Sequence, residues 1–304
     1  MSEAYTVTQC KSEEEWLELR STGIGASEAA AVLGESPWSG PLDVYVRKVG
    51  IADGFSPTEA MEWGHRLEPV VAEKYREETG RIVEDPGEWT VYKNTEQPYA
   101  MATLDRIVTY RPDISRGPGA FELKTAGAAR ADDWAEGPPR HYWIQVQHQL
   151  AVTGWSWGSI AVLIGGNKFL WQDIERDDEF IAHLKTKLAD FWQRVQEHDP
   201  PPPDDTKRSA KLLQKIYPQD TGEIIDLAGE AIGWDEELWQ VKAEILLLDA
   251  RKIHYENILK AAIGSATKAV LPNGVFYTWP VSERAGYEVK ACTVRTLRRH
   301  KPKS

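Results

Sequence analysis

A short apolar run in the middle of the chain, AFELKTAG (120–127), carries an acid and a base two positions apart. Side chains two apart on a β-strand point to the same face, so Glu122 and Lys124 project together if this run is a strand. Asp105, in ATLDRIV (102–108), joins them if its strand is a neighbour. Two carboxylates and the backbone carbonyl of Leu123 then form an oxygen-rich site for a hard divalent cation. Such a cation lowers the pKa of water and offsets charge on a phosphoryl oxygen, and the lysine can hold or help deprotonate that water.

The same residues also have a simpler interpretation. An acid and a base two apart are common on a solvated strand face, and a lone aspartate is more often a turn residue than a ligand. The 17 positions that separate Asp105 from Glu122 fit a hairpin or a longer loop. The three residues by themselves leave both interpretations open.

The N-terminal region predicts two short helices ahead of this run. Ser12 and Glu15 form a capping box that opens a helix through Arg20. The run GIGASEAAAVLG (23–34) predicts a glycine turn and a helix, with Ser27 as its N-cap and Gly34 as its stop.

The next segments predict one long helix followed by strands. Residues 58–80 are strongly helical except at Pro69, which predicts a kink or a new first turn near Glu68. From Arg81 onward, short aromatic and β-branched runs predict three or more strands, at 81–94, 99–110 and 119–126.

The segments after residue 140 predict further helices and a hairpin. The helical spacing in HYWIQVQHQLAVTG (141–154) predicts a helix that ends at Gly154. Residues 157–176 predict a hairpin around Gly165, Gly166 and Asn167, and residues 177–198 predict an amphipathic helix with an acidic first turn.

The clearest boundary in the chain is the proline run DPPPPDDTKRS. It predicts a core at 1–198, a linker at 199–209 and an accessory region at 210–304. In the accessory region, apolar residues at alternating steps of three and four from Leu238 to Ala262 predict a long helix with one apolar seam. That seam packs on its own domain or in an oligomeric coiled coil, and the first alternative is favoured.

The last residues predict a hairpin and a basic tail. Asn273 and Gly274 are typical of a hairpin turn. The tail RTLRRHKPKS (295–304) either touches nucleic acid or frays into solvent.

Composition bounds the class of protein. The chain has 304 residues, of which 41% are hydrophobic, so a packed core is expected. Cys10 and Cys292, the two cysteines, exclude a CxxC-type zinc site and a four-thiolate cluster. The N-terminus has no signal-peptide pattern and no apolar run approaches roughly 18 residues, so we expect a cytoplasmic protein without a membrane partner. The net charge of −11 argues mildly against nucleic acid, although a local basic groove can coexist with an acidic exterior.

Five blocks occur in order along the chain and together resemble one family. They are WLELRSTGIGASEAAAVLG, MEWGHRLEP, ATLDRI, FELKTA and YWIQVQHQLAVTG. This order resembles the phage-type recombination exonucleases, the YqaJ-like family that includes the lambda exonuclease, within the PD-(D/E)xK nuclease superfamily. The resemblance covers roughly residues 13 to 175.

The resemblance implies a fold, an activity and partners. The fold would be α/β, a PD-(D/E)xK nuclease core with a central mixed sheet flanked by helices, plus a C-terminal helical extension with a small hairpin. The activity would be Mg²⁺-dependent digestion of linear double-stranded DNA from the 5′ end in homologous recombination, with Mn²⁺ as a substitute. The partners would be DNA ends, a single-strand annealing protein and further copies of the chain in a homo-oligomer, of which a trimeric ring is one form.

Matching the family motif residue by residue implies a catalytic set. Asp105 and Glu122 would bind the metal with the Leu123 carbonyl, and Lys124 would position or activate the water. Glu68 would support a second ion. Gln145 would orient the nucleophile or the scissile phosphate; without the resemblance, it would be a polar helix face and Glu68 a first-turn acid.

The resemblance also implies a pocket for the 5′-phosphate, made of Arg20, Ser27 and Thr103. An arginine suits a phosphate because its planar fork donates two bonds at once. The alternative for Arg20 is a solvated cap at the end of the first helix. The motif departs from the superfamily pattern at Leu104, which replaces a proline, and at Arg106, which either contacts phosphate or crowds the site.

Two other functions compete with the exonuclease. One keeps the fold and cuts within DNA, as a structure-specific or nicking endonuclease. The other is a non-catalytic DNA-binding or assembly module that uses the tryptophan-rich surface.

Overall fold

The computed structural model describes residues 4–51, 58–110, 117–283, 286 and 297–299. The chain divides into two compact units, Met1–Pro218 and Gln219–Ser304.

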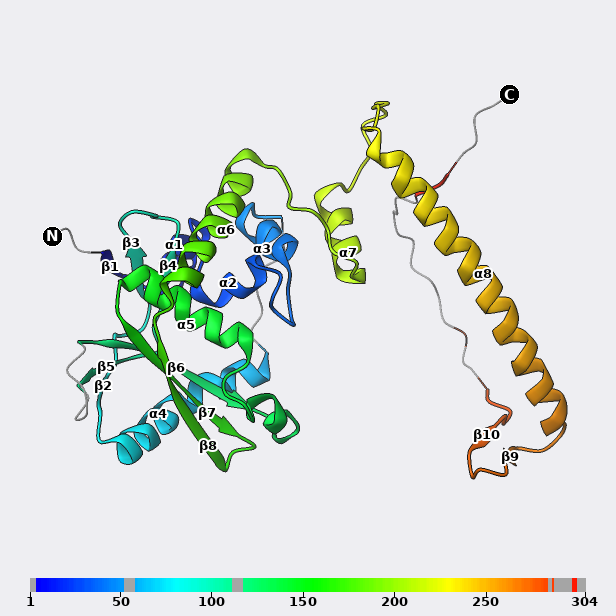
Figure 1. The fold of residues 1–304 in the computed structure, drawn as a ribbon, viewed down its shortest axis with the longest axis horizontal. Coiled ribbons are helices and arrows are strands. Elements are labelled where there is room, and N and C mark those ends of the chain that lie inside the picture. Colours follow the sequence, from blue (N-terminus) through cyan, green and yellow to red (C-terminus); the bar gives the residue numbers. More distant parts are fainter. Residues whose placement is uncertain (1–3, 52–57, 111–116, 284–285, 287–296, 300–304) are drawn as a thin grey trace. The chain divides into compact units, whose positions relative to one another are not determined.

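A five-stranded sheet with the order β2-β5-β6-β7-β8 forms the centre of the first unit (Figure 1). Its strands are Ile82–Glu84, Arg106–Tyr110, Gly119–Ala126, Trp157–Ile164 and Lys168–Glu175. β6 and β7 run parallel, and the other neighbours are antiparallel. The expected central mixed sheet flanked by helices is confirmed.

The parallel pair β6 and β7 requires a crossover, because a tight turn cannot join parallel strands. The crossover contains a 3₁₀ helix, Ala128–Trp134, and helix α5, Arg140–Thr153. Gly154 ends α5 in the left-handed conformation, with φ at 74°, as the sequence predicted.

Helix α4, Glu59–Thr79, covers one face of the sheet (Figure 1). Its residue Val71 belongs to the same buried cluster as Phe121 and Leu123 of β6. The odd-numbered side chains of this part of β6 therefore face α4.

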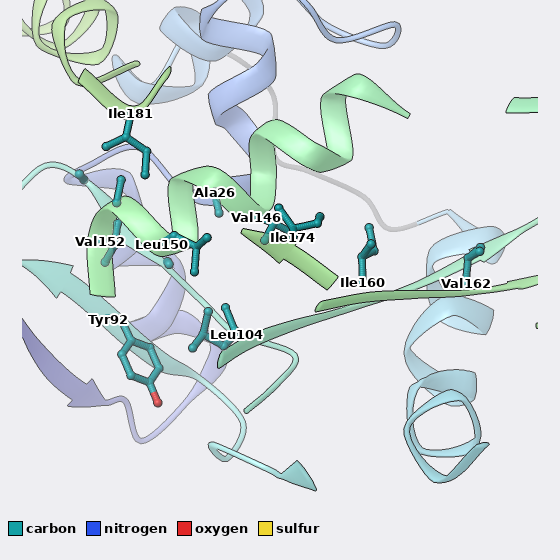
Figure 2. Packing of buried hydrophobic residues seen from close by; sticks show 14 of the residues in the cluster. Ala26, Tyr92, Leu104, Val146, Leu150, Val152, Ile160, Val162, Ile174 and Ile181 are labelled. Atoms are coloured by element: carbon teal, nitrogen blue, oxygen red, sulfur yellow. The ribbon is translucent and has the colours of Figure 1, made fainter. Parts of the chain in front are cut away.

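Helix α5 covers the opposite face. Val146 and Leu150 of α5 share a buried cluster with Ile160 of β7 (Figure 2). Because side chains alternate along a strand, Glu122 and Lys124 lie on this α5 face of β6. The sheet and α5 together place the acid–base pair at a protein interior and not on a solvated strand face.

The remaining helices and a small sheet complete the first unit. The helices are α1 (Glu13–Ser21), α2 (Ala26–Val32), α3 (Pro41–Lys48), α6 (Asp178–Glu197) and α7 (Lys207–Ile216). Apolar residues of α2, α3 and α6 form a second buried cluster with α5. The small sheet has the order β1-β3-β4, with strands Tyr5–Gln9, Thr90–Asn94 and Met101–Ala102.

The helix starts near the N-terminus agree with the sequence in one case and differ in the other. Ser12 caps α1 by accepting a hydrogen bond from the Glu15 N–H at 3.3 Å, as predicted. The prediction of Ser27 as the N-cap of α2 is wrong. Gly25 occupies that position, and the Glu28 carboxylate returns to its N–H at 3.0 Å. Ser27 therefore lies inside the first turn.

The predicted new first turn near Glu68 is also wrong, because α4 is continuous through Pro69. Pro69 is exposed and costs the helix one backbone donor, toward the carbonyl of His65. The buried residues Val71, Ala72 and Tyr75 hold the following turns against the sheet. Packing thus overrides the local preference of the proline.

The predicted strand at 99–110 is divided into two. Its first part, β4, pairs with β3 in the small sheet, and its second part, β5, pairs with β6 in the large sheet. Thr103, Leu104 and Asp105 cross from one sheet to the other. Asp105 therefore lies directly before the first residue of β5, outside the paired part of the strand.

The division of the chain falls after Pro218, beyond the predicted linker at 199–209. Helix α7 begins within that linker and belongs to the first unit, because its residues Leu212, Leu213 and Ile216 pack against the second cluster. Arg208 also pairs with Asp43 of α3.

The second unit contains the long helix α8, Glu230–Ile263, and a hairpin of β9, Lys268–Val270, and β10, Phe276–Thr278. The hairpin turns at Asn273 and Gly274 as predicted, with φ of Gly274 at 87°.

None of the helices in the described ranges combines the length and apolar character that a membrane span requires. Cys10 is a buried free thiol. Cys292 and most of the basic tail lie outside the described residues.

Candidate active site

Glu122 lies at the centre of the site and is almost fully buried, with 1% of its surface exposed. Three nitrogen donors surround its carboxylate. Gln145 Nε2 donates to Oε1 at 2.5 Å and Gln149 Nε2 to Oε2 at 2.6 Å, while Lys124 Nζ also donates to Oε1. A buried carboxylate without such donors would be strongly disfavoured.

Lys124 reaches Glu122 along the same strand face, as the two-residue period predicts. Burial alone would lower the pKa of Lys124, but the carboxylates of Glu122 and Asp105 outweigh it, and the pKa is raised. The ammonium group also lies 4.9 Å from the ring centre of Tyr142. Lys124 is therefore a positively charged donor at neutral pH.

Asp105 joins the pair from the start of β5. Its Oδ2 accepts a hydrogen bond from the Leu123 N–H at 2.8 Å. Burial, and then the neighbouring charge of Glu122, raise the pKa of Asp105 well above its usual range. The N–H and the carbonyl of one strand residue point to the same edge of the strand, and the Leu123 N–H points to Asp105. The Leu123 carbonyl is therefore directed to the same edge of β6. It lies beyond Phe121, whose pair with Arg106 is the last one between β5 and β6.

Glu68 approaches the site from α4. Its carboxylate contacts His65 Nδ1 at 2.9 Å and Arg106 Nη1 at 3.9 Å, and its charge contributes to the raised pKa of Asp105. Arg106 also reaches Asp85 at 3.4 Å. The guanidinium of Arg106 therefore binds two carboxylates, and one of them is Glu68.

The three residues predicted for a phosphate pocket form a second group. Arg20 Nη2 lies 3.5 Å from Ser27 Oγ and its guanidinium lies 4.4 Å from the ring centre of Trp16. Trp16 Nε1 donates to Thr103 Oγ1 at 3.4 Å. Trp16 thus connects the arginine to the segment that carries Asp105.

Further charges support this second group. Glu28 pairs with Lys48 at 2.7 Å and with Arg47 at 3.5 Å. Burial would raise the pKa of Glu28, but Lys48 outweighs it and the pKa is lowered. Burial lowers the pKa of Arg20, partly offset by Glu28. In this group the cations Arg20, Arg47 and Lys48 outnumber the carboxylate of Glu28.

Sequence reasoning missed Gln149 and Glu28. Gln149 follows Gln145 by one helical turn, and this spacing could have indicated that both amides share one face of α5. Glu28 gave a weaker signal, an acid three residues after the true N-cap, Gly25.

The geometry defines an α/β protein with an acid–lysine centre between a mixed sheet and its crossover helix. A family model described as a YqaJ-like viral recombinase domain matches residues 15–156. The uncharacterized protein YqaJ of Bacillus subtilis (strain 168) is 31% identical over 268 residues, which cover 86% of this chain and 82% of that protein. This chain belongs to the YqaJ-like family, and the resemblance seen in the sequence is confirmed. The similarity extends past residue 218 into the second unit.

The solved structures with similar chains include two exonucleases. An alkaline exonuclease from Laribacter hongkongensis is 23% identical, with a TM-score of 0.48, and the match covers 66% of this chain and 99% of that one. A phage related exonuclease from Haemophilus somnus 129PT is 12% identical, with a TM-score of 0.42, and the match covers 58% and 94% of the two chains.

Proposed function

We propose that this chain is a metal-dependent exonuclease that digests linear double-stranded DNA from the 5′ end in phage-type homologous recombination. The observation that carries the proposal is the convergence of Asp105, Glu122 and Lys124 at one buried point of a YqaJ-like chain. Two acids held this close favour a bound cation, and the lysine completes a set suited to phosphodiester hydrolysis.

The donor set fits Mg²⁺. The described residues contain no group of three or more His, Cys, Asp or Glu side chains that could hold a metal ion, so the proposed site relies on two carboxylates and one backbone carbonyl. Asp105, Glu122 and the Leu123 carbonyl offer oxygens only, which suits a hard cation that keeps several waters. A cation would also offset the burial and the charge of Glu122 that raise the pKa of Asp105. Mn²⁺ accepts the same ligands, and Glu68 would serve a second ion.

The ion, when bound, would lower the pKa of water and offset charge on the phosphate oxygens. Lys124, charged because its pKa is raised, holds and orients the attacking water. Gln145 holds Glu122 with one N–H and has a second to offer the water or the scissile phosphate. Gln149 and the strand position keep the Glu122 carboxylate in place while the DNA binds.

The 5′ preference would come from Arg20, Ser27 and Thr103. The Arg20 guanidinium is held over Trp16 and can turn its fork toward a phosphate, with the Ser27 hydroxyl beside it. Thr103 is connected to the same tryptophan and lies two residues before Asp105. This arrangement would bind a terminal phosphate close to the proposed metal centre.

The test is digestion by the full chain in Mg²⁺ of linear duplex with 5′-phosphate or 5′-hydroxyl ends, and of closed circular duplex. We expect release of nucleotides from linear DNA, faster with the 5′-phosphate, and at least about 100-fold less with Lys124→Ala. Equal rates on both ends would count against the Arg20 pocket. Rapid cutting of closed circles would identify an endonuclease, and no cutting at all a non-catalytic module.

Partners follow from the same proposal. The protein would act on DNA ends in the host cytoplasm beside a single-strand annealing protein. Apolar side chains of α8 are exposed along the helix, among them Leu238, Ile245 and Leu248. This surface favours self-association into the proposed ring or another homo-oligomer.

A further inference from the structure

Trp38 is an exposed aromatic ring on a fixed backbone. It lies between α2 and α3, and 54% of its surface is exposed. Arg208 of α7 donates to the Trp38 carbonyl at 2.7 Å and also pairs with Asp43 of α3. The loop is therefore held by a residue of α7 that also pairs with α3, whereas about half of the Trp38 surface stays exposed.

The Trp38 ring belongs to a row of aromatic rings that leads to Lys124. Its centroid lies 4.6 Å from that of His141 and 5.9 Å from that of Tyr142. Tyr142 in turn lies 4.9 Å below Lys124 Nζ, and Trp134 stacks on it at 5.6 Å. Trp38 is thus an exposed ring in direct contact with Tyr142, the ring that lies against the proposed catalytic lysine.

We propose that Trp38 is the stacking surface for the base of the terminal nucleotide that is being released. This rests on the proposed function. An exonuclease must hold the terminal nucleotide whatever its base, and an aromatic face does so because every base has a π-face. Through Tyr142, Trp38 is linked to Lys124, so a base stacked on it would belong to a nucleotide close to the proposed catalytic lysine, and the fixed loop would reduce the entropy lost on binding.

Another role would give a different result. If Trp38 only covers His141 and Tyr142 at the start of α5, its removal would lower stability and act equally on all substrates. If it stacks on a base, its removal would act only on nucleotides that have one.

The experiment compares two linear duplexes whose terminal nucleotide, on the degraded strand, is either adenine or an abasic residue. The wild-type chain is expected to release the adenine nucleotide with a kcat/KM about 5- to 150-fold higher, the range of one base–aromatic stack. Trp38→Ala removes the difference, and Trp38→Phe retains part of it. Trp239→Ala, which removes a ring of similar exposure (58%) in the other unit, leaves the ratio unchanged.

A second readout uses 2-aminopurine at the terminal position, whose fluorescence is quenched by stacking. The quench on binding, measured in EDTA, is expected with the wild type and with Trp38→Phe and is absent with Trp38→Ala. An unchanged ratio and quench in Trp38→Ala would overturn the inference. If the wild type degraded no linear DNA, the proposed function itself would fail, and this outcome is distinct from the first.

Discussion

At the scale of single residues, the environment of Glu122 decides what the acid–base pair can do. The carboxylate is buried yet receives N–H donors from Gln145, Gln149 and Lys124. These hydrogen bonds hold the Glu122 side chain in one rotamer, as a metal ligand requires. Arg106, which could have obstructed the site, instead pairs with Glu68 and Asp85.

Gln149→Leu should weaken the centre without removing a proposed ligand. Glu122 loses one donor, so its carboxylate is less well placed, and we expect a 10- to 100-fold loss in kcat/KM with a higher Mg²⁺ requirement. The measurement is the rate of linear duplex digestion over a Mg²⁺ titration. Gln193→Leu, on the exposed side of α6, serves as the control, and an unchanged Mg²⁺ dependence in Gln149→Leu would contradict the assignment.

His148 makes stability depend on pH. It is fully buried, bonds the Met101 carbonyl at 2.9 Å, and burial lowers its pKa to about 4. Because the unfolded side chain takes up a proton near pH 6.5 and the folded one does not, stability is lost as pH falls through this window. The loss is about 1.4 kcal/mol for each pH unit between roughly 6.5 and 4.

Urea unfolding at pH 7, 6 and 5 measures this effect. His148→Gln should be less stable at pH 7, since a packed ring is replaced, but its stability should fall less steeply with acid. His183→Gln, at an exposed position, should keep the wild-type slope. Equal slopes for wild type and His148→Gln would refute the role of this ring.

At the scale of elements, the fit between α5 and the sheet brings the site residues together. α5 carries Gln145 and Gln149, while β6 carries Glu122 and Lys124. Gly158 of β7 permits this approach: a Cβ there would lie 2.8 Å from both the Ala120 carbonyl oxygen and a methyl carbon of Val146. The glycine is thus required by a close contact between helix and sheet.

Gly158→Ala should therefore push α5 away from β6. We expect a loss of about 1–3 kcal/mol in the free energy of unfolding and a fall in nuclease activity, because the amides no longer meet Glu122. Urea unfolding and duplex digestion measure the two effects. Gly127→Ala meets no atom within 4 Å and should change neither, and a Gly158→Ala protein with normal stability would contradict the packing argument.

At the scale of the whole molecule, helix α8 has an apolar surface that the described residues of its own unit leave exposed. Its seam of alternating steps is exposed, with 52% of Ile245, 59% of Leu248 and 60% of Tyr255 accessible. Charged residues border that seam on both sides, namely Glu237, Glu244 and Arg251 on one and Lys242, Asp249 and Glu256 on the other. This is the pattern of a coiled-coil interface.

An Ile245→Asp, Leu248→Asp double substitution should separate the copies. Charges in the seam oppose burial, so we expect the mass in sedimentation to fall to that of one chain. Asn257→Asp adds a charge away from the seam and should leave the mass unchanged. If the wild type sediments as a single chain, the expectation of a homo-oligomer is wrong.

The sequence by itself determined the elements whose local chemistry and periodicity agree. It predicted β6 with Glu122 and Lys124 on one face, α5 ending at Gly154, and the turn at Gly165 to Asn167, because strand period and glycine conformations are local properties. The ordered blocks also identified the family.

Only the tertiary structure decided where those elements meet. It placed Asp105 at a crossing between two sheets, kept α4 continuous through Pro69, moved the N-cap from Ser27 to Gly25, and joined α7 to the first unit. The N-cap is decided locally, by the Glu28 carboxylate at the Gly25 N–H, whereas the other outcomes depend on packing between segments far apart in the chain, whose energy exceeds the local preference of one residue. The pairing of Arg106 with Glu68 is of the same kind, because α4 and β5 become neighbours only in the fold.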